Sequence, residues 1–156
     1  MLLKLDPKIF EDLKKLKKEG KKIVTTNGTF DLLHPGHVRY LNKAKALGDL
    51  LIVLINSDSS VKQLKGASRP VLAQEIRKEM LLNLKCVDLV IIFNELNPLK
   101  YLEFIKPDFH VKGGSFETEN IIKEQEIVEH NGGKFIVMSL EGSFSTSSII
   151  DRIKNV

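Results

Sequence analysis

Short apolar runs alternate with amphipathic segments along the chain, and this alternation is the strongest constraint on its fold. Leu50–Ile55 is an unbroken apolar run, which is typical of a strand buried on both faces of a parallel sheet. Further strands are expected at Ile23–Thr26, where Asn27-Gly28 interrupts the pattern, and at Leu89–Phe93, Phe109–Lys112 and Lys134–Met138. Strands separated by helices predict right-handed crossovers, and hence an α/β fold with a doubly wound, five-stranded parallel sheet and helices on both faces.

The intervening segments have helical periodicity and recognisable ends. The first helix opens at Asp6-Pro7, closes at Gly20 and has an apolar face of Ile9, Phe10, Leu13 and Leu16. The other helices are expected at Gly36–Leu47, Ser57–Leu64, Ala73–Leu84, Pro98–Ile105, Thr118–His130 and Ser145–Lys154. No linker or repeat interrupts the pattern, so we expect one domain over residues 1–156, with an N-terminal helix in 1–20 and the core in 23–154.

Composition excludes several classes of protein. A single cysteine, Cys86, rules out an internal disulfide, and with four histidines it argues against a zinc module. No apolar run approaches the length of a membrane span, and no secretion signal is recognisable, so we expect a cytoplasmic protein without membrane insertion.

The net charge of +4 is concentrated in lysines near the N-terminus. Nucleic-acid binding is one interpretation, but the chain has no tryptophan and no aromatic residues interleaved with the lysines for base stacking. A solvated helix face explains these lysines more simply, so we expect no nucleic-acid partner. The remaining basic residues are better assigned to small phosphorylated ligands.

The loop after the first strand carries the clearest chemical signal. His34 and His37 are three residues apart at the start of a helix, so both can face one side. A helix N-terminus offers free backbone N–H groups and a positive dipole end, which suit a phosphate. Gly28 and Gly36 allow a ligand to approach the backbone closely. The loop is therefore a candidate phosphate site, although surface histidines near a helix cap are the alternative.

Other loops after strands carry further phosphate-binding candidates. Ser145, Thr146 and Ser147 open the last helix and offer hydroxyls at its N-terminus, although they would also serve as an ordinary cap. The fourth strand ends in Lys112, Gly113 and Gly114, and the loop after the second strand carries Lys65 and Arg69. Each of these cations could also be a plain solvated charge.

The His34-Pro35-Gly36-His37 motif, preceded by Gly28-Thr29-Phe30-Asp31, resembles the nucleotidyltransferase superfamily of cytidylyltransferases and adenylyltransferases. The resemblance extends from Ile23 to Ile153 and implies a Rossmann-like fold. It implies that His34 and His37 stabilise charge on the nucleotide phosphates and that Thr29 and Phe30 supply backbone contacts. The serine-rich start of the last helix is similar to the motif that holds the β- and γ-phosphates, and Lys112 would act with the histidines as a third catalytic residue.

Within the superfamily, several segments are most similar to D-glycero-β-D-manno-heptose 1-phosphate adenylyltransferases. They are Asn56-Ser57-Asp58, Leu64-Lys65-Gly66, Ser68-Arg69-Pro70 and Val111-Lys112-Gly113-Gly114. The chain departs from that pattern at Ser115-Phe116, where Asp-Tyr is usual, and at Ser147, where threonine is usual. The resemblance implies transfer of AMP from ATP to a sugar 1-phosphate, in the route to a lipopolysaccharide core precursor, by a transferase without a fused kinase.

The resemblance also implies partners and a division of labour. The expected partners are ATP with Mg²⁺ and a phosphorylated small-molecule acceptor, and a homodimer is a further expectation. Lys65 and Arg69 are expected to grip the acceptor's phosphate, with Asp31 and Asp58 also on the substrate side, while Lys112 serves the nucleotide. No metal ligands are evident, and the role of Asp31 stays open between structure, substrate and metal.

Three alternatives remain at this point. Glycerol-3-phosphate cytidylyltransferases share the stretch from Gly28 to His34, but this chain has Leu140 where they carry an arginine, which favours ATP over CTP. FAD synthetase-like adenylyltransferases share the histidine motif equally well and are less similar around Lys112. A nucleotide-binding regulatory module without turnover is the non-enzymatic alternative.

Overall fold

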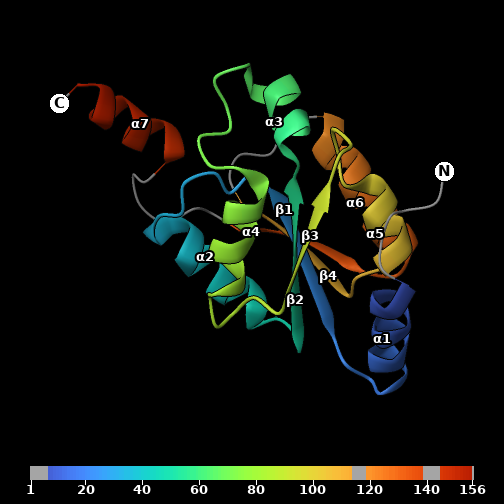
Figure 1. Ribbon diagram of the computed structural model, residues 1–156. Helices are drawn as coiled ribbons and strands as arrows, with labels where there is room; N and C mark the ends of the chain where they lie inside the picture. The colour runs from blue at the N-terminus through green and yellow to red at the C-terminus, as the bar shows by residue number, and fades with distance from the viewer. Residues whose placement is uncertain (1–6, 114–118, 139–144, 156) are drawn as a thin grey trace.

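The computed structural model describes residues 7–113, 119–138 and 145–155, and its core is one parallel sheet (Figure 1). The strands are β1 (Ile23–Gly28), β2 (Leu50–Asn56), β3 (Leu89–Phe93), β4 (Phe109–Gly113) and β5 (Lys134–Met138). Every pair is parallel, and the order is β3-β2-β1-β4-β5. The chain winds outward from β1 to β3 and then returns to β4, which confirms the doubly wound sheet and places a topological switch point between β1 and β4.

Helices cover both faces of this sheet (Figure 1). One face carries α1 (Pro7–Lys18), α5 (Leu99–Ile105) and α6 (Glu119–His130), and the other carries α2 (Pro35–Lys45) and α4 (Gln74–Leu82). The short α3 (Asp58–Lys65) follows β2 at the carboxyl edge of the sheet, and α7 (Thr146–Lys154) stands away from the sheet with no buried residue.

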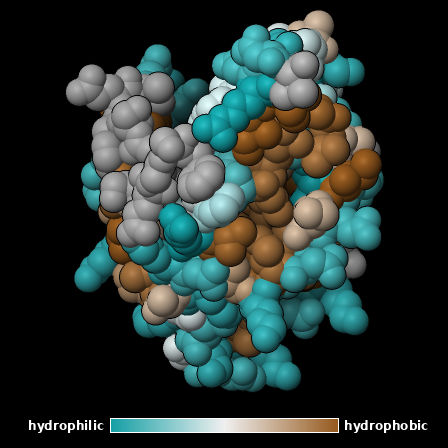
Figure 2. Space-filling view, turned by 90° about the vertical axis from the view of Figure 1, so that its left-hand side faces the viewer, coloured by the Kyte–Doolittle hydropathy of each residue, from teal (hydrophilic) through white to brown (hydrophobic). Residues whose placement is uncertain are grey.

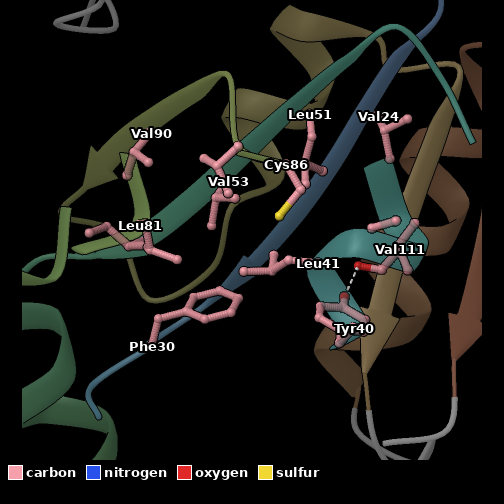
Figure 3. Packing of buried hydrophobic residues seen from close by; sticks show 13 residues of the cluster. Val24, Phe30, Tyr40, Leu41, Leu51, Val53, Leu81, Cys86, Val90 and Val111 are labelled. Atoms are coloured by element: carbon pink, nitrogen blue, oxygen red, sulfur yellow. Dashed lines mark hydrogen bonds between the residues drawn. The ribbon is translucent and has the colours of Figure 1, made fainter. Parts of the chain in front are cut away.

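The interior strand β2 separates two layers of the core. Leu51, Val53 and Ile55 point to the cluster under α2 and α4, where Figure 3 shows Leu51 and Val53 with Leu41 of α2 and Leu81 of α4. Ile52 and Leu54 point to the opposite cluster under α1, α5 and α6. Residues 51–55 are fully buried, which confirms the expected strand covered on both faces.

Several boundaries differ from the sequence expectations for local reasons. β1 does not stop at Thr26, because Asn27 and Gly28 continue to pair with Leu54 and Ile55 of β2. The second helix starts one residue early because His34 is its N-cap and Pro35 occupies its first turn. The fourth is shorter at both ends than expected. Asp6, residues 114–116, Thr118 and Leu140, for which the sequence also gives expectations, lie outside the described residues.

The surface leaves other expectations open. In the described residues, no helix is long and apolar enough to cross a membrane. The loop before α4 and α4 itself carry exposed apolar side chains at Val71, Ile76 and Met80, and the face viewed from the side of α7, α2 and α4 has a broad apolar area (Figure 2). The expected homodimer, the cytoplasmic location and the single domain over residues 1–156 stay predictions.

Candidate active site

A hollow of about 170 Å³ lies at the carboxyl end of β1, beside the start of α2, and we call it the histidine hollow. Among its lining residues are nine that the sequence singled out: Gly28, Thr29, Phe30, Asp31, His37, Lys65, Arg69, Gly113 and Thr146. They come from the end of β1 and the loop after it, the start of α2, the end of α3, the loop before α4, the end of β4 and the start of α7. The fold therefore brings together segments that are far apart in the sequence, at the switch point where α/β sheets bind ligands.

His34 and His37 form a stacked pair at the entrance of α2. Their ring centroids are 3.8 Å apart and the ring planes differ by 23°. The backbone N–H of His37 donates to Nδ1 of His34 over 3.4 Å, which caps the helix. Because Nδ1 of His34 accepts this bond, the proton of the neutral ring resides on Nε2, as a donor.

Both imidazoles are held in the neutral form. Burial lowers the pKa of His34, and burial together with the neighbouring His34 lowers the pKa of His37 to about 4. Nδ1 of His37 is buried and has no hydrogen-bond partner among the described residues. The pair therefore presents neutral hydrogen-bonding groups beside the positive end of the α2 dipole, an arrangement suited to phosphate oxygens.

The turn between β1 and α2 is tight and folds back on itself. A Cβ on Gly28 would lie only 3.0 Å from the ring of Phe30, and Phe30 has a φ of 48°, in the left-handed region. The Phe30 ring also contacts the ring of His37, with centroids 5.1 Å apart. Phe30 therefore supports His37 with its side chain, and both Thr29 and Phe30 line the hollow.

Asp31 holds the loop that precedes α4. Its carboxylate accepts from the backbone N–H groups of Val71 and Leu72 at 2.9 Å and from Nε of Arg69 at 2.7 Å. Burial opposes ionisation, but these hydrogen bonds hold the pKa of Asp31 below its usual range. Asp31 is 2% exposed and saturated by these contacts, so the geometry favours a structural role over the expected contact with substrate.

Lys65 lines the histidine hollow and interacts electrostatically with two other cations, Arg69 and Arg77. Partial burial and the adjacent charges of Arg69 and Arg77 lower the pKa of Lys65, while Asp31 opposes the shift. A lysine disfavoured by neighbouring cations is stabilised by an arriving anion. The electrostatics therefore fit a ligand that carries several negative charges.

Arg77 is a residue that the sequence analysis missed. Its guanidinium is 1% exposed and donates to the backbone oxygens of Thr29 and Leu72 and to the carboxylate of Asp58. Asp58, an expected substrate residue, is therefore held in an ion pair and lines neither hollow that we describe. A cation on the buried face of α4, one turn before the buried Leu81, was the available signal.

The start of α7 closes one side of the histidine hollow. Oγ1 of Thr146 donates to the backbone oxygen of Leu32 over 3.3 Å, and Thr146 lines the hollow. Ser145 forms a capping box with Ser148, and Ser147 is exposed and lines neither hollow. Only Thr146 of the three therefore reaches the lining in the described structure.

A second hollow of about 340 Å³ adjoins the first, and we call it the amide hollow because Asn27, Asn56, Asn97 and Asn120 line it. The two hollows share Gly28, Thr29, Lys65 and Gly113. Lys112 lies in the amide hollow, where its ammonium donates to Oδ1 of Asn27 at 2.7 Å and to both oxygens of Glu124 at 3.1 and 2.9 Å.

This pairing bears on the expected catalytic and nucleotide-binding role of Lys112. Its three protons are engaged by protein acceptors, so it is not a free cation beside the histidines. The nucleotide role of Lys112 stays a prediction that these contacts do not favour. Glu124 was missed by the sequence analysis, although its position between Ile121 and Val128 puts an acid on the inner face of α6.

The remaining expected residues have simple positions. Gly36 is buried in the first turn of α2, beneath the histidine pair, and Gly114 lies outside the described residues. Tyr40 lines the histidine hollow without having been expected there, and its hydroxyl donates to the backbone oxygen of Val111 over 2.8 Å (Figure 3). It ties α2 to β4 at the floor of the site.

The described residues offer no protein cage for a metal ion. They contain no cluster of three or more His, Cys, Asp or Glu side chains that could hold one. The three acids nearest the two hollows are each paired with a cation: Asp31 with Arg69, Asp58 with Arg77 and Glu124 with Lys112. The residues present therefore do not fit a resident Mg²⁺ site.

Comparison with known proteins defines the class. The model of the family described as cytidylyltransferase-like matches residues 25–152, which run from β1 into α7. The chain belongs to the cytidylyltransferase-like family, and it is a nucleotidyltransferase. The expected superfamily, Rossmann-like fold and enzyme class are thereby confirmed.

Two individual relatives are similar to most of the chain. The chain is 47% identical to the "Bifunctional protein HldE" of Geobacter metallireducens over 137 residues, covering 88% of this chain and 28% of that protein. It is 47% identical to the protein of the same name from Helicobacter pylori strain Shi470, covering 91% of this chain and 30% of that one. The chain thus spans less than a third of the length of these relatives.

A solved structure supports the fold. The lipopolysaccharide core biosynthesis protein from Thermoplasma volcanium GSS1 superposes with a TM-score of 0.65 at 28% sequence identity. The match covers 80% of this chain and 100% of that one. The shared architecture is the doubly wound parallel sheet described above.

Proposed function

We propose that this nucleotidyltransferase transfers AMP from ATP to D-glycero-β-D-manno-heptose 1-phosphate, giving the ADP-sugar and pyrophosphate. The observation that carries the proposal is the stacked His34–His37 pair at the N-terminus of α2, of which His37 lines one hollow with Lys65 and Arg69. The motifs shared with heptose 1-phosphate adenylyltransferases and the similarity to HldE proteins support the sugar assignment.

The chemistry needs positioning more than proton transfer. An oxygen of the sugar phosphate attacks the α-phosphorus of ATP, the bond from that phosphorus to the β-phosphate breaks, and pyrophosphate leaves. The attacking phosphate is already anionic at pH 7, so no strong general base is required. The neutral imidazoles and the positive end of α2 then stabilise the charge that develops on the phosphates.

Mg²⁺ enters this proposal only with the nucleotide. Because the acids near the hollows are paired with arginine or lysine, the ion would be held by the oxygens of ATP itself. It would supply charge neutralisation on the leaving pyrophosphate.

A matrix of nucleoside triphosphates against phosphorylated acceptors, read by pyrophosphate release, tests the proposal. We expect ATP with the heptose 1-phosphate to be the best pair, with at least about a tenfold preference over CTP in kcat/KM. His37→Ala is the inactive reference, and His130→Ala, an exposed histidine at the end of α6, is its matched control.

Other outcomes identify the alternatives. Preference for CTP with glycerol 3-phosphate would contradict our proposal and identify a glycerol-3-phosphate cytidylyltransferase. Use of ATP with flavin mononucleotide would identify an FAD synthetase-like enzyme. Binding of ATP without turnover on any acceptor would identify the regulatory module.

A further inference from the structure

The lysine-rich first helix borders a hollow that takes no part in the proposed reaction. This hollow, of about 350 Å³, lies between α1 and α5, at the right of Figure 1, and we call it the lysine groove. α1 ends before β1 begins, and Lys106, which lines the groove, lies between α5 and β4. The groove therefore lies toward the amino ends of the strands, whereas the histidine and amide hollows lie at their carboxyl ends.

The floor of the lysine groove is apolar. The rings of Phe10 on α1 and Phe104 on α5 stack against each other with centroids 4.4 Å apart. Leu13 and Ile105, which are both buried, complete the floor and belong to the core cluster under α1, α5 and α6. Because covering apolar surface is favourable in water, this floor suits the apolar part of a ligand.

The rim of the groove carries more positive than negative charge. Four charged side chains line it: those of Lys14, Lys17, Lys106 and Glu103. The carboxylate of Glu103 accepts a hydrogen bond from Nδ2 of Asn131 over 3.0 Å. Among the described residues, Lys14 pairs with Glu11 in an exposed contact of 3.5 Å, and neither Lys17 nor Lys106 forms an ion pair with an acid. The rim therefore has positive charge available for an anionic group.

The cations of the rim lie directly beside the apolar floor. Burial lowers the pKa of Lys17, the charges of Lys106 and Lys22 add to this shift, and Asp108 opposes it. An ammonium that is disfavoured by burial and by neighbouring cations is stabilised by an arriving anion. Nζ of Lys14 lies 3.8 Å from the centroid of the Phe10 ring. A ligand with an anionic end joined to an apolar body therefore matches both parts of the groove.

We propose that the lysine groove binds a linear anionic amphiphile, a carboxylate on an unbranched hydrocarbon chain, with the chain on the apolar floor and the carboxylate at Lys17 and Lys106. A volume of about 350 Å³ is at the lower end of the range for small-molecule sites, which suits one such chain. A nucleic-acid backbone would contact the lysines and leave the apolar floor uncovered. The inference is independent of the proposed reaction, because α1 lies outside residues 25–152 that the family model matches.

A fluorescent reporter at the rim tests this proposal by binding alone. The chain has no tryptophan, so Glu103→Trp introduces a single indole beside the groove. We expect its emission to change saturably with monomeric decanoate, and not with acetate or with decylamine, which has the same chain length and the opposite charge. Glu79→Trp, at an exposed glutamate on α4 across the sheet, is the matched control and stays silent. Calorimetric titration of the parent chain measures the Kd without the reporter.

Two further comparisons separate the roles of the rim and the floor. Lys106→Glu reverses one exposed charge of the rim without changing the floor, and we expect it to raise the Kd for decanoate about tenfold, the scale of a charge-assisted hydrogen bond. Lys18→Glu, at an exposed lysine of α1 that does not line the groove, is the matched control and should keep the parental Kd within about twofold. Octanoate should bind the parent chain about tenfold more weakly than decanoate, because two fewer methylene groups are buried.

Every other outcome contradicts the proposal in a recognisable way. An indole at position 103 that does not respond to decanoate overturns it, as do equal Kd values for decanoate and decylamine or equal weakening by Lys106→Glu and Lys18→Glu. Binding to phosphatidylglycerol vesicles without binding to monomeric decanoate would overturn it in favour of a membrane surface. Decanoate binding by a chain that releases no pyrophosphate with any acceptor would leave the groove assigned and contradict only the transferase function proposed above.

Discussion

The two hollows share lining residues and differ in the partners of their charged side chains. In the histidine hollow, the cation Lys65 faces further cations, and two neutral imidazoles stand at a helix N-terminus. In the amide hollow, Lys112 is neutralised by a buried carboxylate and also donates to the amide oxygen of Asn27. Each lining carries one net positive charge, because Arg69 is paired with Asp31 in the first hollow, Lys112 is paired with Glu124 in the second, and Lys65 is shared.

The contrast shows that a lysine at a strand end does not by itself mark a phosphate site. Lys65 ends α3 and Lys112 lies near the end of β4, and in the sequence they look alike because a glycine follows each of them. Their partners differ: Glu124 lies on Lys112, while Lys65 has Arg69 and Arg77 nearby. The electrostatic effect of a charged side chain therefore depends on the charged groups around it.

The largest expected effect is on turnover in the histidine hollow. His37→Ala removes one preorganised group beside the transferred phosphate, and we expect kcat to fall about 100- to 1,000-fold. At neutral pH the free energy of unfolding should change less than turnover does, because Nδ1 of His37 has no hydrogen-bond partner among the described residues. Steady-state pyrophosphate release and urea unfolding measure the two quantities, and near-parental turnover would show that the histidine hollow is not where the reaction occurs.

Breaking the Lys112–Glu124 salt bridge should lower the free energy of unfolding. Lys112→Met leaves the buried Glu124 carboxylate without its cation, and we expect a loss of about 2–4 kcal/mol in the free energy of unfolding. Adding Glu124→Gln removes the orphaned charge, so the double variant should be more stable than Lys112→Met alone. Additive losses in a urea-unfolding cycle would mean that the two charges do not neutralise each other.

Lys65 provides the sharpest kinetic comparison at the border of the hollows. Lys65→Ala should raise the KM for the acceptor phosphate about tenfold and the KM for ATP less, the scale of a charge-assisted bond to phosphate. Lys62→Ala, on the exposed side of α3, is the matched control. Equal increases of the KM for ATP and of the KM for the acceptor in Lys65→Ala would contradict the assignment of Lys65 to the acceptor's phosphate.

The last expected effect is a pH dependence of stability. The pKa of His37 is lowered from 6.5 to about 4 by burial and by His34, so the unfolded chain binds more protons than the folded chain between these values. The free energy of unfolding should therefore decrease as the pH falls below 6.5, by about 1 kcal/mol per pH unit from this residue. His37→Gln should flatten that part of the profile, and an unchanged slope would show that the ring is not buried in the neutral form.

Much of the fold and part of the site follow from the sequence. The apolar run at Leu50–Ile55 predicts a strand covered on both faces, and the structure buries it completely. The spacing of His34 and His37 predicts a shared face at a helix start, and the two rings stack there. Both are local properties, because hydrophobic periodicity and the geometry of one helical turn act within a few residues.

The partners of charged groups lie far away in the sequence, so the sequence did not predict them. Asp31 acts on a loop about forty residues later through Arg69, Val71 and Leu72, and Glu124 neutralises a lysine on a different element. Sequence spacing does not encode which distant strand ends meet.

The sequence by itself therefore determined the sheet, its helical layers and the histidine motif of this nucleotidyltransferase. The tertiary structure alone decided that Arg77 and Glu124 belong to the architecture of the site, that Asp31 holds a loop, and that Lys112 is half of a neutral pair. The physical reason is that Coulomb interactions and desolvation depend on distance and burial in space, and both are set only when the β1, β2 and β4 ends converge.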